Sequence, residues 1–236
     1  MASPAVNRLG FLGTTTAATS HSLSFQVPNP SAGELIIVGL RFAAAPGTIT
    51  FTGYTSFAGP DTSDASDDST GLWYRQADGT EGGSASISTA NSVKAAGGCW
   101  IITGAENPAT QPPQTSTVAI GTTANANATT VTPTGGSKDY LWLQFLGMDG
   151  ETQTATSAAT WTDNTNNNSG TGGAAATNCI AWQASLQSTA ASMDPAAWTS
   201  SAPTTGWTVW AFAVHPPAAA AGSLMLPNRT RITRKR

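Results

Sequence analysis

Residues Glu34 to Phe42 read ELIIVGLRF, and this stretch decides the fold because it is the most apolar segment of the chain. Pro30 and Gly33 come just before it, and a carboxylate opens it. The run of branched apolar residues is too short and too closely bounded by glycine for a helix. The pattern therefore predicts a buried central β-strand.

A second stretch later in the chain repeats this pattern. Asp139 to Phe145 read DYLWLQF and follow Pro133 and two glycines, Gly135 and Gly136. Shorter matches follow in the same order, namely residues 50–52 with 160–162, 72–77 with 180–185, and 99–105 with 207–214. Because the order and the spacing are both kept, we expect an internal duplication that gives two related halves.

Composition favours β-structure throughout. The 236 residues include 24 Gly and 14 Pro, and only 10% are charged, whereas amphipathic surface helices need many charged residues. Further short runs alternate polar and apolar residues, as in Thr48 to Tyr54. No long helical period links the strands, which disfavours a parallel α/β fold. We predict an all-β fold, an antiparallel β-sandwich or jelly roll.

The expected organisation follows from the two halves and the segments around them. We expect an N-terminal arm or edge strand over 1–21, a first β-sandwich half over 22–107, a Pro/Thr-rich linker over 108–128, a second half over 129–217, and an Ala-rich linker with an extended basic C-terminal tail over 218–236.

Charge is unevenly distributed along the chain. The last eight residues carry five of the ten bases, Arg229, Arg231, Arg234, Lys235 and Arg236. Residues 1–228 therefore hold five bases against thirteen acids, a net charge of −8. The tail is a candidate docking arm for an acidic partner, and a solvated, solubilising end is the alternative. Nucleic acid is disfavoured, because the acidic body would repel phosphates and no aromatic residue lies between the tail bases.

Cys99 and Cys179 are the two cysteines, and both lie in apolar strand-like runs. Their places in the two halves are not equivalent, which favours buried free thiols over a disulfide. The N-terminal residues lack the continuous apolar core of a secretory signal, and no stretch approaches the roughly 18 apolar residues of a membrane span. We expect synthesis in the cytoplasm without a signal peptide, and no membrane partner.

An acidic loop is the one candidate metal site. Asp61, Asp64, Asp67 and Asp68 supply the oxygen ligands that calcium prefers. The loop lacks the spacing of an EF-hand and its closing glutamate, so a solvated loop is the alternative. No other cofactor is expected.

No catalytic motif is present in the sequence. His21 and His215 stand far apart and outside any metal or triad pattern, and there is no nucleophile elbow, zinc-protease motif or phosphate loop. Acidic pairs such as Asp149 with Glu151 lie in polar turns, where solvated carboxylates are the ordinary case. We therefore expect a non-enzymatic protein.

Eight tryptophans offer material either for the core or for stacking on sugars. Most fall on alternating strand positions, where core packing is the ordinary role. Trp198, in a loop that begins near Met193, is the best candidate for an exposed glycan contact. The Asn-rich segment from Asp163 to Ser169 could present amides to a ligand, and a plain flexible turn explains it equally well.

The order of elements resembles the tail, fibre and decoration proteins of tailed bacteriophages and related gene-transfer particles. The resemblance rests on the turn, acid and apolar strand at Pro30 to Phe42, the Leu72 to Ala77 strand LWYRQA, the closing IITGA at residues 101–105, and a second degenerate copy. It covers about residues 22–217 and has no catalytic residues to transfer. It implies a β-sandwich on a particle surface, sometimes in contact with host glycans.

These observations predict a structural component of a phage-like virion, on the particle surface as a capsid decoration, head spike, tail fibre or other tail appendage. Strands with few lysines have edges that would aggregate unless neighbouring subunits cover them, which suggests virion subunits and further copies of this chain as partners. The alternative function is a carbohydrate-binding module that recognises a host cell-surface polysaccharide.

Overall fold

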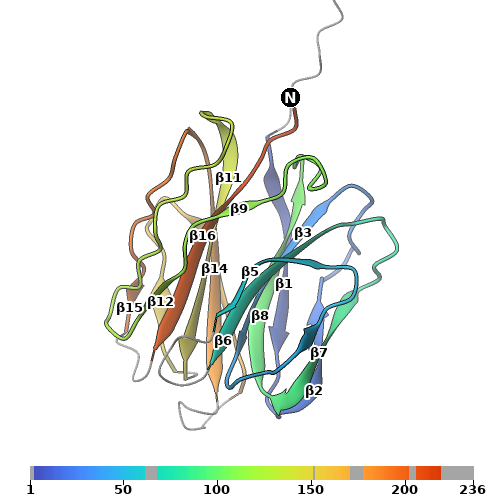
Figure 1. The fold of residues 1–236 in the computed structure, drawn as a ribbon, viewed down its shortest axis with the longest axis vertical. Helices are drawn as coiled ribbons and strands as arrows, with labels where there is room; N and C mark the ends of the chain where they lie inside the picture. The colour runs from blue at the N-terminus through green and yellow to red at the C-terminus, as the bar shows by residue number, and fades with distance from the viewer. Residues whose placement is uncertain (1–2, 62–67, 151, 171–177, 202–205, 219–236) are drawn as a thin grey trace, which may run out of the picture.

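A computed structural model describes residues 3–61, 68–150, 152–170, 178–201 and 206–218. The fold is all-β and antiparallel (Figure 1). The strands of the described residues are β1 (Ala5–Gly13), β2 (Ala18–Ser24), β3 (Leu35–Phe42), β4 (Ile49–Thr50), β5 (Thr55–Asp61), β6 (Ser69–Gln76), β7 (Ser84–Val93), β8 (Ala95–Thr103), β9 (Gln114–Thr115), β10 (Ala119–Gly121), β11 (Lys138–Asp149), β12 (Ala155–Thr156), β13 (Thr162–Asn168), β14 (Cys179–Ala190), β15 (Thr199–Ser200) and β16 (Trp207–Val214).

The strands form two main sheets and one small one. The first sheet is curled and has eight strands in the order β4-β7-β2-β1-β8-β3-β6-β5. The second has six, in the order β10-β16-β11-β14-β13, with β9 also paired to β16. The small sheet contains β12 and β15. In both main sheets the longest apolar strands occupy the interior, where neighbours on both sides satisfy their backbone groups.

The core has three apolar layers because both central strands are buried on both faces. Along β3, Ile36 and Val38 point into the curl of the first sheet, whereas Leu35 and Ile37 point toward the second sheet. Along β11, Leu143 and its alternating neighbours complete that middle layer. The opposite face of β11 belongs to an outer layer that includes Trp142, Trp182 and Trp207.

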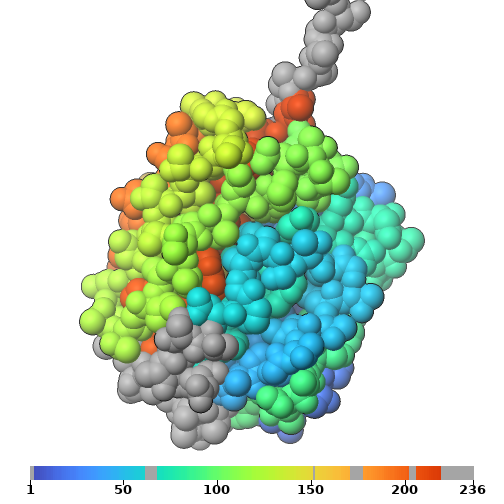
Figure 2. Space-filling view, in the orientation of Figure 1, coloured from blue at the N-terminus to red at the C-terminus, as the bar shows by residue number. Residues whose placement is uncertain are grey.

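The outer apolar layer is covered by a segment of the chain that connects two strands. Ala126, Ala128 and Val131, from the segment between β10 and β11, pack into it. Figure 2 shows this segment spread over the second sheet, with only a small part of β16 visible beneath it. The cover is needed because a sheet face that carries several tryptophans cannot be left in water.

Glycines let the two sheets approach closely in the middle layer. A Cβ on Gly39 of β3 would overlap the Phe145 ring of β11, and a Cβ on Gly98 of β8 would overlap the Gln183 side chain of β14. On the other sheet, a Cβ on Gly147 would lie 2.9 Å from Cδ of Arg41. The sheets are thus fitted to each other with a side chain from one opposite a glycine of the other.

The two central predictions from the sequence are confirmed. Glu34 to Phe42 contains β3, whose eight residues are all buried, and Asp139 to Phe145 lies within β11. The all-β, antiparallel class is also confirmed. The same chain order appears in both sheets, since β8-β3-β6-β5 in the first is matched by β16-β11-β14-β13 in the second.

Three local predictions were wrong. Residues 5–13 form no arm or edge strand but β1, which pairs with β2 on one side and β8 on the other. The alternating stretch Thr48 to Tyr54 forms a strand only at Ile49–Thr50, because Gly53 turns the chain with a φ of +80°. The expected Pro/Thr-rich linker contributes β9 and β10, which pair with β16.

We predict that Gly39→Ala destabilises the protein by about 1–3 kcal/mol, because the added methyl group has to displace the Phe145 ring in the middle layer. The urea midpoint measures this cost. Gly83→Ala is the matched control, since its Cβ would lie 3.5 Å from the Asn29 side chain and should change the unfolding free energy by less than about 0.5 kcal/mol. Equal effects of the two substitutions would contradict the close fit of the sheets.

Candidate functional site

A buried charge cluster joins the two sheets at one end of the middle layer. Arg41 of β3 is fully buried, and its Nη2 donates to Asp68 Oδ2 at 3.0 Å and to Asp149 at the end of β11. Its Nη1 donates to Thr70 Oγ1 at 3.0 Å and to Thr208 Oγ1 at 3.1 Å. One guanidinium therefore connects the first sheet to β11 and β16 of the second sheet.

This cluster has the chemistry of a structural link rather than of a reaction centre. Arg41, Asp68 and Asp149 are all 0% exposed, as is usual for an ion pair inside a core. The guanidinium fork can satisfy two carboxylates and two hydroxyls at once, which a lysine ammonium could not do with the same geometry.

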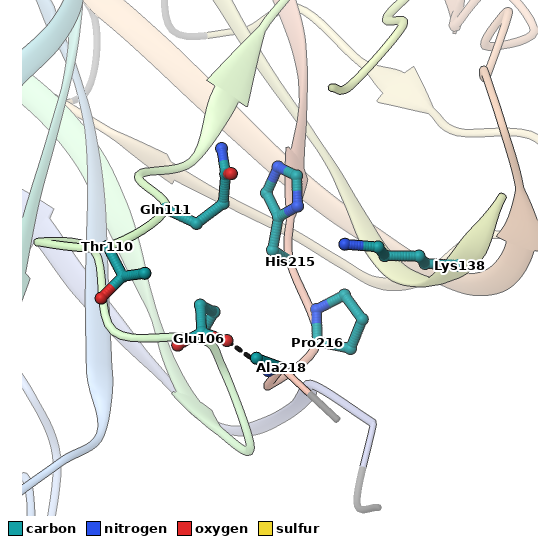
Figure 3. A pocket seen from close by; sticks show the side chains of 7 residues that line it. All are labelled: Glu106, Thr110, Gln111, Lys138, His215, Pro216 and Ala218. Atoms are coloured by element: carbon teal, nitrogen blue, oxygen red, sulfur yellow. Dashed lines mark hydrogen bonds between the residues drawn. The ribbon is translucent and has the colours of Figure 1, made fainter. Parts of the chain in front are cut away.

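A buried histidine, His215, lies at the surface of a cavity just after the end of β16. The cavity, of about 130 Å³, is lined by Glu106, Thr110, Gln111, Lys138, His215, Pro216 and Ala218 (Figure 3). The backbone holds its walls together, since Glu106 N–H donates to the His215 carbonyl at 2.9 Å and Ala218 N–H donates to Glu106 Oε2. The site thus brings together the loop after β8, the start of β11 and the end of β16.

Hydrogen bonding fixes the tautomer of His215. Gln114 Oε1 accepts from the backbone N–H of Thr134 at 2.7 Å, which identifies that atom as the oxygen of the amide. His215 Nε2 lies 3.0 Å from the same oxygen and must therefore carry a hydrogen. In the neutral ring Nδ1 is then a bare acceptor, and it has no hydrogen-bond partner although His215 is only 2% exposed.

The environment keeps the His215 ring neutral. Burial, and to a smaller extent the Lys138 cation, lower its pKa from 6.5 to about 4, while the Glu106 carboxylate acts in the opposite direction. At neutral pH the Nδ1 lone pair is therefore available. An acceptor, an ammonium and a carboxylate around one cavity can hold a polar molecule. Among the residues that the structure describes, no hydroxyl or thiol is hydrogen-bonded to the His215 ring.

Sequence reasoning did not find this site. Glu106, Lys138 and His215 are far apart in the chain, and each stands outside any recognisable motif. Only the strand order, which places β16 beside β11, brings His215 near Lys138.

Two of the four residues proposed for calcium, Asp61 and Asp68, lie among the described residues. Asp68 is buried and bound to Arg41, so its carboxylate neutralises a cation already present in the protein. Asp61 lies on β5, and Asp64 and Asp67 fall outside the described residues. The described part of the chain contains no cluster of three or more His, Cys, Asp or Glu side chains that could hold a metal ion.

The expectation that Trp198 is exposed was wrong. Trp198 is 0% exposed. Its indole Nε1 donates to Gln144 Oε1 at 2.9 Å, and its backbone N–H donates to the Ala126 carbonyl. The loop folds back because the outer face of the second sheet needs an apolar cover. All eight tryptophans are buried, so none presents a face on which a sugar could stack.

The other expected site residues have mixed outcomes. Arg229, Arg231, Arg234, Lys235 and Arg236 lie outside the described residues, as does Glu151. Asp149 is not solvated but buried against Arg41. Most of the Asn-rich segment is neither loop nor turn but β13, an edge strand of the second sheet that pairs with β14.

Both cysteines are buried free thiols, as predicted. Burial raises the pKa of Cys99 to about 12 and that of Cys179 to about 12. Neither thiol can therefore supply a thiolate near neutral pH.

No family model, curated protein or solved structure matches this chain. The described residues include no helix with the length and apolar character needed to cross a membrane.

We predict that Arg41→Met destabilises the protein by about 3–5 kcal/mol, because it leaves two buried carboxylates without their cation. Chemical denaturation at neutral pH measures the change. Lys138→Met is the control, since Lys138 is exposed at the start of β11 and its loss should cost less than about 1 kcal/mol. A cost for Arg41→Met as small as that of the control would rule out the cluster as a link between the sheets.

We also predict that burial of His215 makes the unfolding free energy of the protein sensitive to acid. Its folded-state pKa of about 4 lies below 6.5, so the unfolded chain binds a proton more readily and stability falls as the pH falls from 6.5 toward 4. Burial lowers the pKa of His21 too, which adds to the effect with the same sign. His215→Gln should make the loss of unfolding free energy over this range shallower.

Imidazole NMR resonances give a direct test of the same expectation. The His215 midpoint should lie near 4, and a midpoint near 6.5 would show that the ring is not desolvated as the structure has it.

Proposed function

We propose that the protein is a non-enzymatic structural component of a phage-like virion, on the particle surface as a capsid decoration, head spike or tail appendage. The observation that carries the proposal is where the reactive groups lie. The Arg41 cluster and both thiols are enclosed within the packing, and they serve the fold rather than a substrate. Such an arrangement suits a rigid building block.

We further propose that the chain is a duplicated β-sandwich protein. In each half the central strand (β3 or β11) lies between two strands that come later in the chain (β8 and β6, or β16 and β14). A fourth strand (β5 or β13) lies on the outer side of β6 or β14. The matching orders β8-β3-β6-β5 and β16-β11-β14-β13 support this, because two unrelated four-strand arrangements would seldom coincide. In the first half β1 and β2 extend the sheet, whereas β9 and β10 are much shorter in the second.

The face formed by β2 and β7 is uncharged and suits contact with water. Exposed serines face one another across β2 and β7, in the pairs Ser20 with Ser88, Ser22 with Ser86, and Ser24 with Ser84. The outermost strands are short or irregular, since β4 has two residues and β5 carries register shifts and Pro60. These edges are protected by their own geometry, so assembly is not required to prevent edge aggregation.

The alternative is a module that binds polysaccharide through an exposed tryptophan. It has less support, because Trp198, its expected contact residue, is buried. The proposal for partners is therefore other virion subunits and copies of this chain, with the basic tail as an anchor on an acidic neighbour. The tail sequence carries five positive charges next to an acidic body, which is the charge contrast such an anchor needs.

We predict that the protein sediments with a megadalton particle when a nuclease-treated lysate of producing cells is run on a density gradient and the fractions are probed for this chain. Deletion of residues 228–236 should reduce its incorporation, and replacement of the five tail bases by glutamine should do the same if charge is the cause. Recovery only as a small soluble species would contradict the structural role. Unchanged incorporation after the deletion would contradict the anchor alone.

A further inference from the structure

We propose that the cavity beside His215 is a binding site for a hydroxyl group of a small polyol or of a single sugar unit. The site lies apart from the Arg41 cluster, and its argument does not depend on assembly into a particle. It rests on the hydrogen-bonding capacity of the groups that line the cavity.

The first step is the unused acceptor on His215. The ring donates through Nε2 to Gln114, which leaves Nδ1 as a buried lone pair without a partner. A buried polar atom of this kind is normally satisfied by water or by a ligand. Whatever occupies the cavity must therefore donate a hydrogen to Nδ1.

The second step is the ammonium of Lys138. Figure 3 shows the Lys138 side chain directed toward the His215 ring across the cavity. An ammonium has only hydrogens to donate, so a group between the two residues must accept from Lys138 while it donates to His215. A hydroxyl does both. An ionised carboxylate has no hydrogen for Nδ1, and a cation would be repelled by Lys138.

The third step extends the contact beyond one hydroxyl. The carboxylate of Glu106 also lines the cavity, and its two oxygens accept from the backbone N–H groups of Asn107 and Ala218. These bonds hold the carboxylate in place, and each oxygen keeps a further lone pair for a second hydroxyl. Neighbouring hydroxyls on a polyol or sugar could then reach His215 and Glu106 together.

The size and walls of the cavity limit the ligand. About 130 Å³ has room for one small unit but not for a chain, and the Pro216 ring offers an apolar wall for carbon-bound hydrogens. Thr110 and Lys138 are exposed at its margin, so a ligand can enter from solvent. This site differs from an aromatic platform, because recognition comes from hydrogen bonds rather than from stacking.

The test is a titration of the full-length ¹⁵N-labelled protein with glycerol, glucose, galactose and N-acetylglucosamine, followed by the imidazole nitrogen resonances of His215. Concentrations should reach about 100 mM, because one small site without stacking is expected to bind in the millimolar range. We expect at least one probe to give a saturable shift of the Nδ1 resonance, which moves as that atom gains a hydrogen bond.

Two variants and one control locate the binding. Lys138→Met and His215→Phe should each weaken the affinity by about tenfold or more, since each removes one half of the donor and acceptor pair. Lys94→Met is the control, because Lys94 bonds to Asn178 outside the cavity and its loss should leave the affinity unchanged. Lys138 is exposed, so that variant stays informative even if His215→Phe folds poorly.

Two outcomes would overturn the proposal. One is that no probe shifts the His215 resonance in a saturable way, which would mean that water alone fills the cavity. The other is a shift that Lys138→Met leaves unchanged. Neither result bears on particle association, which the gradient experiment measures separately.

Discussion

The structure depends on a close approach of two sheets whose central strands are each buried on both faces. Arg41 imposes the strictest condition on that approach, because a guanidinium in the middle layer must keep its carboxylates and hydroxyls within hydrogen-bonding distance. Its partners come from the loop before β6, from β6, from β11 and from β16. A shift of one sheet by a single residue would separate them and leave charges buried without compensation.

The glycines of the middle layer also allow the close approach of the sheets, because they leave space for side chains of the opposite sheet. Gly147 lies beside Arg41 and leaves space for its stem, while Gly39 leaves space for Phe145. Apolar contacts supply most of the stabilisation in such a layer, but many relative positions of two apolar sheets would bury similar area. The charge cluster and the glycine contacts together select one of these positions. Their contribution is thus to the uniqueness of the arrangement as much as to its stability.

The sequence was informative where a residue's role follows from its immediate neighbours. The run from Leu35 to Phe42 predicts a buried strand because every position except Arg41 is apolar or small, and the structure pairs Arg41 within the core. Trp198 and Thr48 to Tyr54 were misjudged for opposite reasons. A loop near Trp198 became buried because a distant sheet face needed a cover, and an alternating run was cut short because a glycine turned the chain. The His215 cavity could not be predicted, since strand order alone brings its three charged or titratable residues together.

The enclosure of both thiols has a practical consequence for experiments on this protein. Cys99 and Cys179 are fully buried in separate apolar layers and protonated at neutral pH, so alkylating and maleimide reagents should find no accessible thiolate in the folded state. A single cysteine introduced at an exposed serine, such as Ser22 or Ser86, would then be the one reactive thiol. Fluorophores, spin labels or heavy atoms could be attached there without removal of the native cysteines, and the protein could be followed in an assembly with its core intact.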